Sequence, residues 1–280
     1  MSLDSFAGES SVSANPVLKY PSFPRQIWTY LRCTAVIGEI EMRKLRHDPT
    51  ELLTRAVQPA LWLVVFGKAF SKIRAIPTGK VDYLTFLTPG VLAQSLMFIS
   101  IFYGLMIIWD RDQGILQKFL VMPVPRASFV TGKAFGAGVR AISQAVVIFI
   151  LALLLQVQLQ WTVAGVVGTI LTVLVGSSFF ATLSMLIAIF LKTRERFMGF
   201  GQVITMPLFF ASNAIYPISI MPTWLRVLAR ANPLSYIVDL LRGYLIAGHS
   251  SNFLLDWVVL LGALVVVQLI AARTYQRIMM

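Results

Sequence analysis

The sequence predicts an all-α integral membrane protein with six transmembrane helices, an N-terminal amphipathic interfacial helix and short re-entrant outer helices before the last span. Of its 280 residues, 57% are hydrophobic and 13% are charged, and the mean hydropathy is +0.76. A soluble domain carries about 25% charged residues. The formal net charge of +12 would suggest nucleic-acid binding in a soluble protein. Cytoplasmic loops rich in Lys and Arg explain it better here, so no nucleic-acid partner is expected.

The N-terminal part divides into a polar tail and an amphipathic helix. Residues 1–25 contain no apolar run of the kind found in signal peptides, and we expect a disordered cytoplasmic tail. In residues 26–52, apolar side chains such as Trp28 and Leu31 recur at near-helical spacing among Arg and Glu. This pattern predicts a connecting helix along the inner membrane surface, which ends before Pro49.

Residues 53–280 form the predicted transmembrane domain. It contains six apolar runs of about 20 residues, the length that crosses the hydrocarbon core of a bilayer. We place the spans at 53–71, 84–108, 134–157, 161–190, 198–218 and 253–272. Lys and Arg concentrate in the loops on one side, which orients both termini toward the cytoplasm. Lys68, Lys72, Arg74 and Lys80 in the first outer loop are exceptions.

An inner segment at about 111–124 is more elaborate than a plain turn. Four apolar side chains fall on one face of a short helix, and Pro123 ends it. These side chains are Ile115, Leu116, Phe119 and Leu120. Taken alone, the pattern favours an ordinary interfacial helix without a partner over a docking helix.

The outer segment at about 219–250 is too polar and too interrupted for a full crossing. Two short helices separated by Pro233, which dip into the outer leaflet, fit it better. Asp239 and Arg242 are three residues apart and therefore share one face of the second helix.

The sequence offers little material for catalysis or metal binding. His47 and His249 fall on opposite sides of the membrane, so they cannot share a ligand set. No G-x-x-x-x-G-K-[ST] loop for binding ATP phosphates is present. We therefore predict no catalytic, cofactor or metal residues in this chain, and no ATPase activity of its own.

Few polar side chains occur within the spans, and no charge is expected at mid-depth. Gln58, Gln94 and Gln144 are interpreted mainly as helix–helix hydrogen-bonding groups. The fifth span has Met and aromatic side chains that suit the wall of a roomy apolar cavity. Contact with lipid fits them equally well.

Four features, taken in order, connect the chain with a known family. They are an amphipathic helix that ends at RHDP (46–49), a first span with Gln58-Pro59, a charged segment from RDQG (111–114) to PVPR (123–126), and Tyr216-Pro217 followed by Asn232-Pro233. Together they resemble the permease subunits of type-2 ABC exporters, which include drug-resistance and lipo-oligosaccharide export permeases. The resemblance covers about residues 25 to 272.

This resemblance implies the membrane-spanning permease subunit of an ABC exporter. The subunit would move an amphipathic drug, lipid or lipid-linked saccharide outward across a bacterial inner membrane. Separate ABC ATPase subunits would bind ATP and Mg, so no cofactor is expected in this chain. A second permease copy would pair with the first about a two-fold axis as a homodimer.

The resemblance also implies roles for particular residues. Residues 111–124 would be the coupling helix that contacts the ATPase through Ile115, Leu116, Phe119 and Leu120. Spans two and five would line the translocation path, which assigns to it Gln94, Met206, Phe209, Phe210 and Asn213. The outer helices would cap this path with Pro233, Asp239 and Arg242.

Two other classes of function are kept open. An ATP-independent channel or secondary carrier predicts buried charges in the spans. A non-transporting membrane scaffold predicts that the inner apolar face has no effect on transport. Neither explains both a docking-type inner helix and a broken outer segment.

Overall fold

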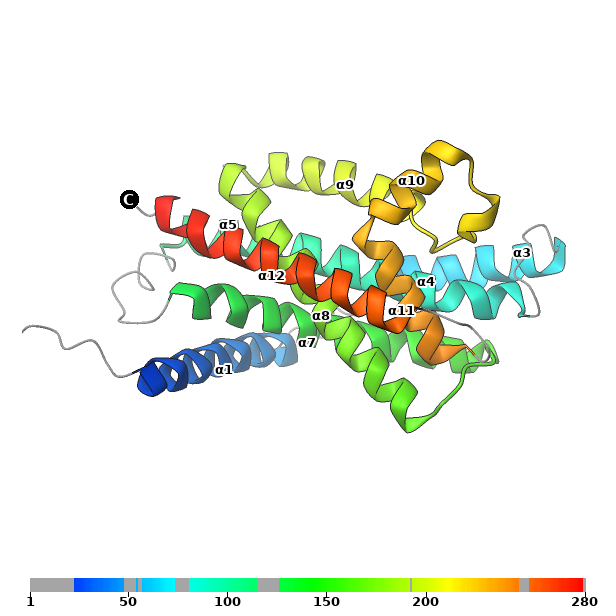
Figure 1. Cartoon of the computed structure of the whole chain (residues 1–280), viewed down its shortest axis with the longest axis horizontal. Coiled ribbons are helices and arrows are strands. Elements are labelled where there is room, and N and C mark those ends of the chain that lie inside the picture. The colour runs from blue at the N-terminus through cyan, green and yellow to red at the C-terminus, as the bar shows by residue number, and fades with distance from the viewer. Residues whose placement is uncertain are drawn as a thin grey trace, which may run out of the picture.

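The computed structural model describes residues 23–47, 54, 57–73, 81–114, 126–191, 193–246 and 252–278, and every regular element in these ranges is helical (Figure 1). The prediction of an all-α chain is confirmed for this part of the protein. In chain order the elements are α1 (Phe23–His47), the π-helical stretch η1 (Trp62–Gly67), α3 (Lys68–Ile73), α4 (Tyr83–Phe102), α5 (Gly104–Asp112), α7 (Arg126–Leu154), α8 (Val163–Phe190), α9 (Arg194–Phe210), the 3₁₀ turn η2 (Ile218–Ile220), α10 (Thr223–Ala231), α11 (Pro233–Leu245) and α12 (Phe253–Ile278).

Four helical stretches are long and apolar enough to cross a membrane. They are Tyr83–Asp112, which joins α4 and α5, Ser128–Leu154, Val163–Phe190 and Phe253–Thr274. These correspond to the predicted second, third, fourth and sixth spans. The chain is therefore a multi-pass membrane protein.

The predicted fifth span is shorter in the structure, and the predicted first span, 53–71, is described only in part. Val57–Phe70 is a short apolar helix, and α9 ends at Phe210 although a span to residue 218 was predicted. The chain turns there because the Ser212 hydroxyl donates to the carbonyl of Phe209 (2.7 Å) and accepts from the amide of Ala214 (3.2 Å). The count of six spans therefore stays a prediction.

Helix α8 lies at the centre of the bundle. It packs against α4, α7, α11 and α12, and its buried Phe180 belongs to a large apolar core together with residues such as Leu87, Leu92 and Leu241. Of the four membrane-length helices, α4 is the most enclosed and α12 the most exposed.

Helix α1 runs alongside the first half of α7 (Figure 1). The Tyr30 hydroxyl donates to the Thr131 hydroxyl oxygen (2.9 Å), and Gly132 brings α7 close to the side chain of Ile37. The predicted N-terminal helix is present and packs closely against α7 at Gly132. Trp28 is exposed, and the position of this helix at a membrane surface stays a prediction.

The outer segment forms two short helices, as predicted. Asn232 separates α10 from α11, and Pro233 is the first residue of α11. The Asn232 side chain accepts from the amide of Leu234 (3.0 Å) and donates to the carbonyl of Leu208 (2.6 Å), so one cap joins both helices to α9. How deeply these helices enter a bilayer stays a prediction.

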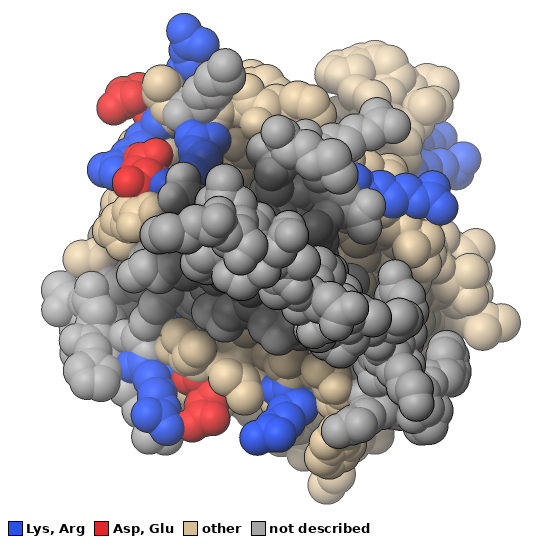
Figure 2. All heavy atoms as spheres, turned by 90° about the vertical axis from the view of Figure 1, so that its left-hand side faces the viewer, with Lys and Arg blue, Asp and Glu red and all other residues tan. Residues whose placement is uncertain are grey.

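Both ends of the described chain lie at one end of the bundle. Helix α1 begins and α12 ends there, where α5 also ends and α9 begins (Figure 1). Figure 2 views this end, and Lys and Arg lie around its rim with few Asp and Glu between them. Arg111, Arg194 and Arg196 belong to the helix ends concerned. This distribution is what we expect of a cytoplasmic face.

Candidate functional site

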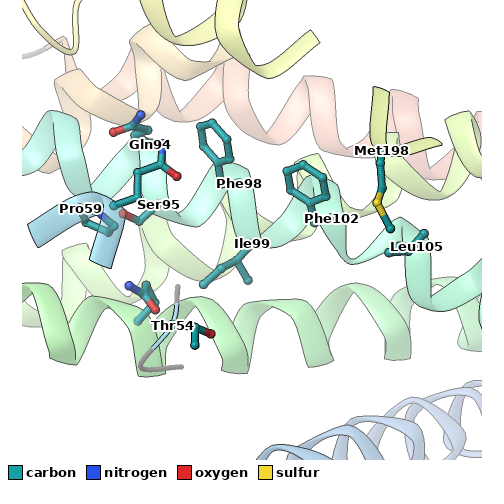
Figure 3. Close-up of a pocket in the computed structure, with 11 residues that line it drawn as sticks. Thr54, Pro59, Gln94, Ser95, Phe98, Ile99, Phe102, Leu105 and Met198 are labelled. Carbon is teal, nitrogen blue, oxygen red and sulfur yellow. The ribbon is translucent and has the colours of Figure 1, made fainter. Parts of the chain in front are cut away.

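A cavity of about 370 Å³ lies between α4, α5, α7, α9 and the start of the helix at Val57–Phe70. Figure 3 shows Gln94, Phe98 and Phe102 projecting from α4, with Pro59 on one side and Met198 of α9 on the other. The α4 residues follow each other at intervals of four, so they form one stripe of the helix. All the lining residues are uncharged: Thr54, Gln58, Pro59, Gln94, Ser95, Phe98, Ile99, Phe102, Leu105, Gln144 and Met198.

The polar part of this cavity consists mainly of glutamine amides. Within the described ranges, the Gln94 amide nitrogen and both amide atoms of Gln144 have no hydrogen-bond partner, although the two residues are only 3% and 1% exposed. The Ser95 hydroxyl donates to the Val91 carbonyl of its own helix (2.9 Å). The predicted helix–helix hydrogen bond of Gln144 is therefore wrong for the part of the chain that the structure describes. An amide both donates and accepts, so these groups suit a ligand with hydroxyl, amide or carbonyl groups.

The structure separates the five residues assigned to the translocation path. Gln94 lines the cavity, whereas Met206 is a half-buried residue of α9. Phe209 is buried against the edge of Trp62, with ring centroids 5.4 Å apart, and Phe210 lies 6.4 Å from the same ring. Asn213 belongs to a different cluster near α11. The assignment of these residues to a path stays a prediction.

One of the predicted outer-cap residues, Arg242, is a buried arginine. The Arg242 guanidinium donates to the carbonyls of Asn213 (2.8 Å), Ala214 (3.1 Å) and Phe86 (3.4 Å), and its central carbon lies 3.6 Å from the centroid of the Phe86 ring. Burial lowers the pKa of Arg242 to about 10, and Asp239 opposes this shift, so the group stays charged at neutral pH. Arg242 therefore fastens the turn after α9 between α4 and α11.

Asp239 lies on the same helix and extends this network. Its carboxylate accepts a hydrogen bond from the Asn213 amide nitrogen (2.6 Å). Asp239 and Arg242 also line one outer cavity, as expected of two side chains on one helix face. Pro233 begins α11 and has no charged role in the cluster.

The structure also contains buried charges, which the sequence analysis missed. The prediction of no charge at mid-depth is wrong, because Arg140 is only 5% exposed near the middle of α7, with its guanidinium 5.6 Å from the centroid of the Tyr103 ring. On the same helix, the Lys133 ammonium is 2.7 Å from the Asp110 carboxylate of α5. An arginine inside an apolar run was the available signal in the sequence.

The four residues assigned to ATPase coupling cannot be placed. Ile115, Leu116, Phe119 and Leu120 lie outside the described residues, which stop at 114 and resume at 126. The last described turn before them, in α5, carries Asp112, whose carboxylate is 3.0 Å from the Arg194 guanidinium of α9. Coupling through residues 111–124 stays a prediction.

Comparison with known proteins identifies the family. The model of the ABC-2 type transporter family matches residues 34–246. The chain belongs to the ABC-2 type transporter family. It is 31% identical to the ycf38 protein of Cyanophora paradoxa, over 74% of this chain and 71% of that protein.

Other ABC-2 relatives come from bacteria. The chain is 26% identical to the daunorubicin resistance ABC transporter permease protein DrrB1 of Streptomyces coeruleorubidus, over 73% of this chain and 74% of that protein. It is 23% identical to nodulation protein J of Rhizobium leguminosarum bv. viciae, over 82% and 88% of the two chains. The resemblance to type-2 ABC permeases is therefore confirmed. Members of the ABC-2 family are transport membrane subunits that work with ABC ATPases.

Proposed function

We propose that this chain is the permease subunit of an ABC exporter that moves an amphipathic drug, lipid or lipid-linked saccharide outward. The observation that carries the proposal is the uncharged cavity on α4, in which glutamine amides lie beside aromatic side chains. Such a wall can contact the apolar part of a ligand and hydrogen-bond to its polar part. The named role of DrrB1 in daunorubicin resistance supports a drug or another amphipathic molecule.

ATP would be bound and hydrolysed, with Mg, by separate ABC ATPase subunits. Family membership supports this partner, and the predicted amphipathic face of residues 111–124 supplies a docking surface for it. A second permease copy completes the proposed complex. The proposed location is a bacterial inner membrane with both termini in the cytoplasm, which the basic rim of the end in Figure 2 supports.

The cavity is tested by transport measurements. The chain is reconstituted in vesicles with an ABC ATPase that co-purifies with it, and ATP-dependent movement of fluorescent amphipathic compounds is measured. Gln94→Leu and Gln144→Leu remove the hydrogen-bonding amides while keeping a similar side-chain size, so we expect at least a tenfold loss of transport. Gln202→Leu, the same change at an exposed position of α9, is the control. Equal transport by all four proteins would refute the role of the cavity.

Coupling to the ATPase is tested separately. Phe119→Asp and Leu120→Asp place charges on the predicted docking face, and the double variant should fold but lose both co-purification with the ATPase and regulation of its ATP hydrolysis. If neither the native chain nor the variant binds any ABC ATPase, the exporter proposal fails.

A channel or secondary carrier is the second candidate, because one observation favours it. Arg140 and the Asp110–Lys133 pair are buried ionisable groups of the kind that ion-coupled carriers use. Vesicles that contain the chain without an ATPase distinguish the two functions. Substrate movement driven by an ion gradient in such vesicles would support the carrier and exclude the ATP-driven mechanism.

A further inference from the structure

A second cavity, of about 560 Å³, lies among α10, α11, the turn after α9 and the beginning of α12. Its chemistry is opposite to that of the cavity on α4, because charged side chains line it. They are Arg230, Asp239, Arg242 and Asp256. Three side chains of the wall have buried oxygen atoms, and the hydrogen bonds that these atoms lack indicate what the cavity can bind.

Three buried oxygen atoms in this wall have no hydrogen-bond partner among the residues that the structure describes. They are Asn213 Oδ1, Ser235 Oγ and Asp256 Oδ2. Their residues are only 3%, 3% and 4% exposed. A buried polar atom without a partner costs about 1–3 kcal/mol, so three of them around one cavity indicate a group that satisfies them.

The network around Asn213 determines which of its amide atoms remains available. Its amide nitrogen donates to Asp239 Oδ1 (2.6 Å), which fixes the side chain so that the amide oxygen is the unpartnered atom. The missing partner must therefore donate a hydrogen bond or carry positive charge. Asp256 Oδ2 requires the same kind of partner, since an ionised carboxylate can only accept hydrogen bonds.

The positively charged side chains of the wall do not supply this missing partner. The Arg242 guanidinium donates to the backbone carbonyls of Asn213, Ala214 and Phe86. Arg230 is exposed, so solvent and salt screen its charge. The charge of Arg242 offsets one of the two carboxylates, and the interior of the cavity keeps a negative balance.

We propose that this outer cavity binds a cationic group, held by Asp256, Ser235 and Asn213 beside Asp239. Carboxylate, amide and hydroxyl oxygens are ligands of hard metal ions. They equally accept hydrogen bonds from an ammonium group. The site is separate from the cavity on α4, and its binding chemistry does not depend on the proposed transport function.

The test measures the thermal unfolding midpoint of the full chain in a neutral detergent at constant ionic strength. Tetraethylammonium chloride is the background salt, because its bulky quaternary ammonium has neither an N–H nor an O–H to donate. Na⁺, Ca²⁺ and propylammonium are added in separate titrations. We expect at least one of them to raise the midpoint saturably. A response to a metal ion alone identifies an inorganic cation, and a response to propylammonium alone identifies the ammonium group of a larger molecule.

Two variants connect any response with this cavity. Asp256→Asn should raise the half-saturating concentration at least tenfold, whereas Asp112→Asn, the same change in an exposed ion pair, should leave it unchanged. Ser235→Ala removes one oxygen without changing the charge and should raise the half-saturating concentration severalfold. This variant tests the proposal if Asp256→Asn does not fold. No saturable response to any of the three cations would overturn the proposal, because water alone would then satisfy the oxygens. An equal response from the native chain and the folded variants would also overturn it.

Discussion

The buried ion pair between α5 and α7 should be among the most sensitive points of this fold. Lys133 and Asp110 are 2.7 Å apart, with side chains only 4% and 10% exposed. Removing one partner leaves the other charge buried and uncompensated, which costs about 3–5 kcal/mol. We therefore expect Lys133→Met to destabilise the chain by about that amount. The double variant Asp110→Asn/Lys133→Met should recover part of the loss, because it leaves no charge behind.

A neighbouring ion pair provides the matched control. Arg194 and Asp112 are 3.0 Å apart and link α9 to the same helix α5, but their side chains are 45% and 39% exposed. Arg194→Met should cost at most about 1 kcal/mol, because exposed pairs contribute little. The assay is reversible unfolding by SDS in mixed micelles, followed by circular dichroism. If Lys133→Met costs no more than Arg194→Met, burial does not govern the strength of these pairs and the reasoning is refuted.

Three further substitutions can be measured in the same assay. Gly90→Ala should cost about 1–3 kcal/mol, because a Cβ there would overlap the Ala214 carbonyl oxygen, whereas Gly199→Ala in open space should cost nothing. Arg242→Met should cost more than about 3 kcal/mol, since three buried carbonyl oxygens lose a donor; a cost near zero would contradict its fastening role. Asn232→Ala should cost about 1–2 kcal/mol through loss of the α11 cap, and an unchanged midpoint would show that the cap is dispensable.

The long spans could be predicted because their signal is local. An apolar run of more than about 20 residues has few alternatives to a membrane helix, and α8 and α12 begin within two residues of the predicted positions. The end of α9 could not be predicted in this way. It depends on the hydrogen bonds of Ser212 and on Asn232, which lies in a later part of the chain.

The polar residues of the spans were recognised, but their partners were not. Gln94 and Gln144 meet in one cavity because of how α4 and α7 are rotated about their axes, and periodicity alone does not fix that rotation. Both helices have further polar neighbours in the sequence that point elsewhere. The buried charge of Arg140 could have been predicted, since an arginine inside an apolar run is visible in the sequence alone.

The buried charges lie where they can affect the cavity on α4. Helix α4 continues into α5 through Tyr103, whose backbone is helical, and the cavity wall runs past this residue from Phe102 to Leu105. At this junction, Arg140 of α7 lies over the Tyr103 ring. Further along α5, Lys133 of α7 pairs with Asp110.

The Asp110–Lys133 ion pair links α5 to α7, and α5 also packs against α8. The residues after α5 are those proposed to contact the ATPase, so a displacement there would reach α5 first. The ion pair to Lys133 would pass such a displacement on to α7. Because Leu105 of α5 belongs to the cavity wall, a displacement of α5 would change the shape of the cavity directly.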